Sequence, residues 1–79
     1  MAKIRLLTEG RGTGRVHPTE VDAEWTLAYA EDGTKVIQIS TFGSDNRVSR
    51  PKVSQTIQVD SAIAEQLLLI LKNEFQRDH

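Results

Sequence analysis

Three stretches of the chain alternate between apolar and polar residues, and each is expected to form a β-strand with one buried face. The clearest runs from Val21 to Tyr29, where apolar side chains alternate with acids and threonine. The second runs from Thr34 to Phe42, and the third runs from Lys52 to Val59. A shorter stretch with the same period, Lys3 to Leu7, is expected to add a fourth strand.

The sequence Ala-Glu-Asp-Gly-Thr between the first two long stretches predicts a hairpin, and the apolar pattern selects its register. A two-residue loop would set Trp25 opposite Ser40, which is a poor core pair. A three-residue loop with a left-handed Gly33 avoids this. The pairs that it predicts are Ala30 with Thr34, Leu27 with Ile37 and Trp25 with Ile39.

Helical periodicity follows from about Ser61 to Gln76, with Asp60 or Ser61 as N-cap. We expect this helix to cover the apolar sheet face and to bury Trp25 beneath it. The helix is apolar on all sides from Leu67 to Leu71, which is wider than a covering helix needs. The surplus predicts either a second copy of the chain or a covering N-terminal segment. The dimer interface expected for a second copy comprises Leu67, Leu68, Ile70, Leu71 and Phe75.

These elements predict one α+β domain, a curved antiparallel β-sheet of about four strands followed by one C-terminal amphipathic helix, dimerised. Its parts are an N-terminal strand and glycine/arginine-rich loop (1–19), the sheet (20–59) and the helix (60–77). The chain has no cysteine, and its first residues lack the apolar region of a signal peptide. Its longest apolar run is far shorter than a membrane span. We therefore expect a cytoplasmic protein with no membrane partner.

The stretch "TEGRGTGRVHP" resembles a phosphate-binding loop in its glycine content. Phosphate and dinucleotide loops both require a helix directly after the glycines, and here a strand follows. Two interpretations remain open. Arg11 and Arg15 belong to a basic arm that lies along a phosphate backbone, or the stretch is a plain connection.

Catalytic chemistry finds little support in the chain. His17 lies in a loop before proline, His79 is the last residue, and neither has a ligand partner at metal-binding spacing. Asp22 and Glu24 share a strand face, where solvated charge is the ordinary role. We expect a non-enzymatic protein without metal or cofactor.

The net charge is −1, but the charges are segregated. Basic residues gather in the N-terminal segment and again before the last strand, around a polar sheet face. Single-strand binders combine such cations with aromatic rings. On this face the one aromatic expected is Phe42, which either stacks on a base or packs under the 43–51 loop. The basic residues assigned to this surface are Arg5, Arg11, Arg15, Arg47, Arg50 and Lys52.

The order of a tryptophan-led strand, "DGTKVIQI" across a hairpin and "RPKVSQTIQVDSAIAEQLLLIL" resembles the positive-cofactor-four family of transcriptional coactivators. The similar region covers about Glu24 to Phe75. The resemblance implies a homodimer packed through its C-terminal helices, with sheets that form channels for unwound DNA. It also implies that Lys35, Arg47, Arg50 and Lys52 contact phosphates and that Phe42 stacks.

We therefore expect a nucleic-acid-binding protein, with single-stranded DNA preferred, RNA left open, and a role in transcription implied by the resemblance. The alternative is a small protein-interaction or regulatory adaptor that uses the wide apolar helix face and binds no nucleic acid.

Overall fold

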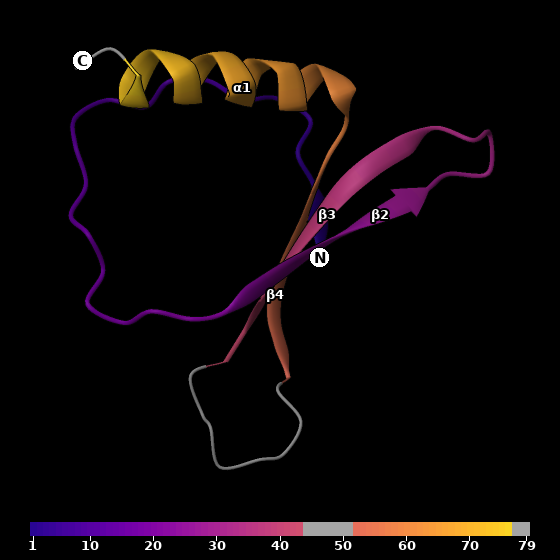
Figure 1. The fold of residues 1–79 in the computed structure, drawn as a ribbon, viewed down its shortest axis with the longest axis horizontal. Coiled ribbons are helices and arrows are strands. Elements are labelled where there is room, and N and C mark those ends of the chain that lie inside the picture. The colour runs from indigo at the N-terminus through magenta and orange to yellow at the C-terminus, as the bar shows by residue number, and fades with distance from the viewer. Residues whose placement is uncertain (44–51, 77–79) are drawn as a thin grey trace.

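A computed structural model describes residues 1–43 and 52–76 of the chain. It contains the strands β1 (Ala2–Lys3), β2 (Ala23–Tyr29), β3 (Lys35–Phe42) and β4 (Val53–Val59), followed by helix α1 (Ser61–Phe75) (Figure 1). The sheet has the order β1-β4-β3-β2, in which β2, β3 and β4 are antiparallel neighbours. The α+β layout expected from the sequence is therefore confirmed.

The β2–β3 hairpin has the predicted register. Trp25 pairs with Ile39 and Leu27 pairs with Ile37. The Ala30 N–H donates to the Thr34 carbonyl oxygen at 2.8 Å, and the Gly33 N–H donates to the Ala30 carbonyl oxygen at 3.0 Å. Gly33 has a φ of 89°, so this is the three-residue loop in which glycine takes the left-handed conformation.

Replacing Gly33 with alanine is expected to lower the free energy of unfolding by about 1 kcal/mol, because a Cβ disfavours positive φ. Open space surrounds the position, so the cost comes from the backbone alone. Urea denaturation measures it. Gly10→Ala is the matched control, since Gly10 also lies in open space but does not have a positive φ. An equal loss in both variants would contradict the assignment.

The N-terminal strand is shorter than predicted, and it pairs parallel to its neighbour where an antiparallel pairing was expected. Only Ala2 and Lys3 form β1, which pairs parallel to β4, so the sheet is mixed and not wholly antiparallel. The Ile4 N–H still donates to the Gln58 carbonyl oxygen at 2.9 Å. Beyond it the chain turns to run beside α1, where the Gln66 side chain donates to the Leu7 carbonyl oxygen at 3.4 Å. This contact with the helix replaces the rest of the expected strand.

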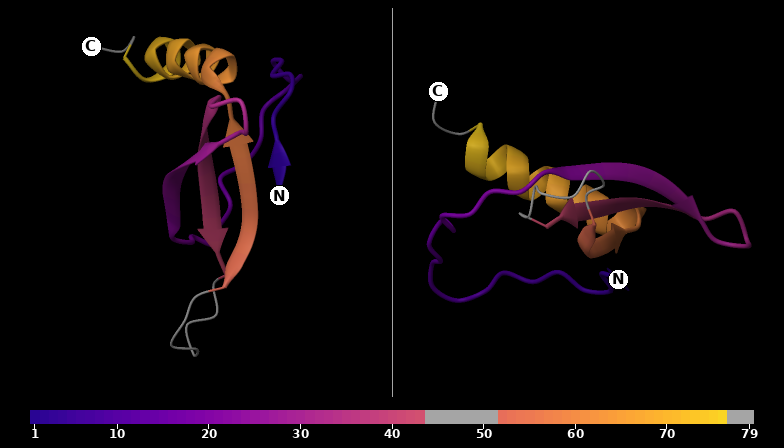
Figure 2. Two further views of the ribbon diagram at one scale, coloured as in Figure 1. Left: turned by 90° about the vertical axis from the view of Figure 1, so that its right-hand side faces the viewer. Right: turned by 90° about the horizontal axis from the view of Figure 1, so that it is seen from below.

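Residues 4–22 connect β1 to β2, and the part from 8 to 22 is solvent-exposed and forms neither helix nor strand. The segment follows the helix outward and then returns to the start of β2 on the helix side of the sheet (Figures 1 and 2). A Cβ built on Gly10, Gly12 or Gly14 would meet no atom within 4 Å. We call residues 8–22 the arm.

Helix α1 begins as predicted, because the Asp60 carboxylate accepts the Ile63 N–H at 3.0 Å and so caps the first turn. Only Asp60 separates β4 from α1. This connection is too short to fold the helix back across the sheet, and α1 projects away from it (Figure 2). The expectation that Trp25 lies under the helix is wrong, since Trp25 is 66% exposed.

The two sheet faces differ in chemistry, because side chains of paired residues share a face and successive residues alternate. One, which we call the apolar face, carries Trp25, Leu27, Ile37, Ile39, Ile57 and Val59. The other, which we call the polar face, carries Glu24, Thr26, Gln38, Ser40, Thr56 and Gln58. In the described part of the chain only Val59 and Ile63 are buried apolar residues, each 4% exposed. The core is therefore a small contact between the end of β4 and the first turn of α1.

Candidate nucleic-acid interface

The polar face is ordered by side-chain hydrogen bonds across its two central strands. The Gln58 side-chain amide donates to the Gln38 Oε1 atom at 2.8 Å. The Ser40 and Thr56 hydroxyl groups lie 3.0 Å apart, and both residues are buried. These bonds hold a row of uncharged donors and acceptors in fixed positions on β3 and β4. This row can contact bases and sugars, and Glu24, which pairs with Ser40 on the outer strand β2, is the acid beside it.

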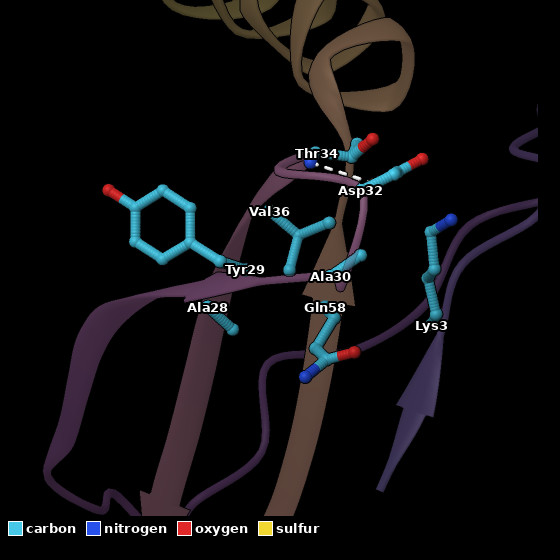
Figure 3. Close-up of a pocket in the computed structure, with 8 residues that line it drawn as sticks. All are labelled: Lys3, Ala28, Tyr29, Ala30, Asp32, Thr34, Val36 and Gln58. Atoms are coloured by element: carbon cyan, nitrogen blue, oxygen red, sulfur yellow. Dashed lines mark hydrogen bonds between the residues drawn. The ribbon is translucent and has the colours of Figure 1, made fainter.

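A shallow hollow of about 310 Å³ lies at the hairpin end of the polar face (Figure 3). The residues that line it are Lys3, Ala28, Tyr29, Ala30, Asp32, Thr34, Val36 and Gln58. Figure 3 shows the Tyr29 ring at one side of the hollow and the Lys3 side chain at the other. Most of these residues are exposed, so the hollow is an open groove on the sheet.

Asp32 marks the hairpin end of this groove with a fixed negative charge. Its Oδ1 atom accepts the Thr34 N–H at 2.9 Å. Hydrogen bonds from the Thr34 side chain and backbone hold the pKa of the Asp32 carboxyl below its ordinary value, and the nearby Lys3 ammonium adds to this. The carboxylate stays ionised near neutral pH, so a bound phosphate is disfavoured beside the turn.

Lys3 is a cation of this face that the sequence pattern did not assign to the site. It pairs with Gln58 in the sheet, and its ammonium lies 3.8 Å from the Asp60 carboxylate. An ion pair as exposed as this one contributes about 1 kcal/mol at most, so a phosphate can replace the carboxylate. The alternation of Lys3 and Arg5 with Ile4 and Leu6 was visible in the sequence, but the parallel pairing with β4 was not.

Two of the predicted site residues, Phe42 and Lys52, lie at the opposite end of the sheet, and the register shift there gives Phe42 to the polar face and Lys52 to the other face. Phe42 ends β3 and pairs with Val53, next to a shift in register that follows Thr41. The Gly43 N–H donates to the Lys52 carbonyl oxygen at 3.1 Å, so Lys52 lies directly across from the end of β3. Phe42 is half-buried and Lys52 is exposed. An aromatic ring and a cation therefore lie where the chain leaves the sheet.

The remaining predicted cations are not gathered with this pair. Lys35 pairs with Tyr29 and shares the face of Ile37, so it lies on the apolar side of the sheet. Arg11 and Arg15 belong to the arm, which runs on the helix side (Figure 1). Arg5 is exposed in the short stretch that leads from β1 toward the helix. Arg47 and Arg50 lie outside the described residues.

The expected dimer-interface residues are largely open to solvent. Leu67 is half-buried, and Leu68, Ile70, Leu71 and Phe75 are 45–74% exposed. One side of the helix is lined by residues 7–9, which share a hollow with Gln66, Ile70 and Asn73. The N-terminal segment therefore covers part of the helix, which was one of the two alternatives for the surplus apolar surface. It leaves most of that surface exposed.

Within 1–43 and 52–76, no three residues among histidine, cysteine, aspartate and glutamate come together as a metal site. The His17 Nδ1 atom accepts the Thr19 N–H at 3.0 Å in a local turn. Over that part of the chain no helix has the length and apolar character needed to cross a membrane.

Comparison of the chain with protein-family models, with curated proteins and with solved structures finds no match.

Proposed function

We propose that this protein binds single-stranded nucleic acid, DNA in preference to RNA, on the polar face of its sheet. The observation that carries the proposal is the composition of this face. Uncharged hydrogen-bonding side chains occupy its centre, Lys3 lies at one end, and Phe42 lies at the other, where the exposed Lys52 follows at the same end of the sheet. A strand that follows the face would have cations for its phosphates and a ring for one of its bases.

Exposed cations support the same proposal. Within residues 1–43 and 52–76, Lys3 is the one lysine or arginine with an ion-pair partner. Arg5, Arg11, Arg15 and Lys52 are all exposed. In this proposal the residues at the ends of the polar face contact phosphates directly, and the arm arginines act as long-range attraction. We also propose that the protein is not an enzyme and that it acts in transcription. The role in transcription rests on the family resemblance alone.

The test is a salt titration of binding to a fluorescent single-stranded oligonucleotide, with RNA and duplex DNA as parallel probes. Each phosphate contact on a single strand contributes about 0.7 to the slope of log K against log salt. A Lys3→Ala, Lys52→Ala double variant is expected to weaken binding and to lower this slope by about 1.4. Anisotropy measures both quantities.

Lys72→Ala is the matched control, because Lys72 lies in the last turn of α1 and away from the polar face. It removes the same charge and should change the slope little. Absence of binding at low salt, or an equal effect of the control, would overturn the proposal.

The second candidate function is the protein-interaction adaptor, which the exposed apolar surface of α1 favours. It predicts that the purified chain binds none of the three nucleic acids and sediments as a monomer until another protein covers the helix. The salt titration and a sedimentation run therefore separate the two functions.

A further inference from the structure

The apolar face of the sheet and one side of α1 form a continuous apolar corner. Ala64, in the second turn of α1, lines a hollow together with Ile37 and Val59 of the apolar face. Leu68, Leu71 and Phe75 follow Ala64 at helical spacing and continue the same side of the helix. Both the sheet side and the helix side of this corner are open to solvent, since Leu27 is 45% exposed and Phe75 is 74% exposed.

The chain exposes more surface than a compact monomer of its mass, and both the arm and the apolar corner contribute to it. A folded monomer of 8.9 kDa exposes about 4,800 Å². This chain exposes 7570 Å². Its radius of gyration is 15.3 Å, against about 12 Å for a compact domain of this length. The extra surface includes most of the large apolar side chains of the sheet and helix.

We propose that helix α1 of a second copy covers the apolar face, and that the exchange is reciprocal. If each chain buried half of its extra surface in this way, the interface would cover about 2,800 Å² in total. Obligate homodimers bury about 2,000–5,000 Å². The proposal concerns the apolar face alone and does not depend on nucleic-acid binding by the polar face.

A second copy fits the corner because the chain itself supplies the missing part. The 15-residue helix is about 22 Å long, which matches strands of seven or eight residues at about 3.3 Å each. Helix α1 projects off its own sheet (Figure 2), and its Ala64 lines a hollow with Ile37 and Val59 of the apolar face. A two-fold axis that lays one helix on the partner's sheet therefore lays the other helix on the first sheet. Each chain then covers the apolar face of the other with its own helix.

This arrangement differs from a dimer held only by helix-to-helix contacts, and cysteine crosslinking separates the two. The chain has no cysteine, so single cysteines can be placed freely. Chains with Leu27→Cys, on the sheet, are mixed with differently tagged chains with Leu71→Cys, on the helix. We expect a mixed disulfide between the two. Leu69→Cys is the matched control, since Leu69 is also exposed but lies on another side of α1, and it should give no mixed disulfide.

A measurement on the unmodified chain guards against variants that misfold. Trp25 is the chain's one tryptophan and lies on the apolar face. Its emission should be blue-shifted at concentrations where sedimentation gives a dimer, and should shift to the red as dilution gives monomer. A monomer at all concentrations, a dimer with solvent-exposed Trp25, or disulfides only between Leu71→Cys chains would overturn the proposal.

Discussion

A chain in which glutamate replaces Leu27 is expected to sediment as a monomer and to lose most of its thermal stability. In the single chain Leu27 is half exposed, and a glutamate there would cost little. In the proposed dimer the same position lies under the partner's helix, where an unpaired charge costs several kcal/mol. The two-fold axis applies this cost twice per dimer. Sedimentation equilibrium and thermal denaturation measure the two effects.

The control for this experiment is one residue away. Thr26 precedes Leu27 in β2 and lies on the polar face, opposite Gln38. Thr26→Glu introduces the same charge into the same strand but leaves the apolar face intact, so this variant should remain dimeric. Two results would contradict the pairing proposed here. Either Leu27→Glu remains a dimer of wild-type stability, or both variants dissociate alike.

Local chemistry made the hairpin and the helix start predictable. The β2–β3 register follows from the alternation of apolar residues and from the one conformation that Gly33 permits in a three-residue loop. The start of α1 follows from Asp60, whose side chain replaces the missing partner of a first-turn N–H. Both features depend on residues within a few positions of each other.

The covering of the apolar face could not be predicted in the same way. Alternation shows that Trp25 and Leu27 need cover, but it is identical whether the cover comes from the same chain or from another. The single residue between Val59 and Ser61 decides the direction of α1, and no periodicity reports it. The expectation of a helix over its own sheet was wrong for this reason.

Non-local pairing also limited the prediction of the candidate site. Lys3 reaches the polar face only because β1 pairs parallel to β4 across more than fifty residues. Lys35 was assigned to phosphate contact by resemblance, yet the hairpin register places it on the side of Ile37. Phe42 and Lys52 were predicted as site residues, and the β3–β4 pairing makes them neighbours.

The period of two in a β-strand lets this small sheet carry two separate functions. In our proposals the apolar face holds the assembly together and the polar face meets the nucleic acid. Because the side chains of successive residues point to opposite faces, a substitution in one strand can alter one function and spare the other. Positions 26 and 27 of β2 are the sharpest such pair.

Thr26→Glu is therefore expected to weaken oligonucleotide binding about tenfold at low salt while the dimer persists. It adds a carboxylate beside Glu24, the acid already on the outer strand of the polar face, and both would repel a phosphate on the neighbouring strands. Two charges about 4 Å apart interact by about 1 kcal/mol in water and more near a protein surface, and tenfold corresponds to about 1.4 kcal/mol. Anisotropy at several salt concentrations measures the loss, which should shrink as salt screens the repulsion.

Leu69→Glu provides the matched control, because it places the same charge on an exposed position of α1 that belongs neither to the polar face nor to the apolar corner. Its binding should stay close to that of the unmodified chain. If Leu69→Glu weakens binding as much as Thr26→Glu, the effect comes from net charge and the polar face is not the site. If neither variant changes binding, the nucleic acid contacts another surface, and the arm with Arg11 and Arg15 becomes the next surface to test.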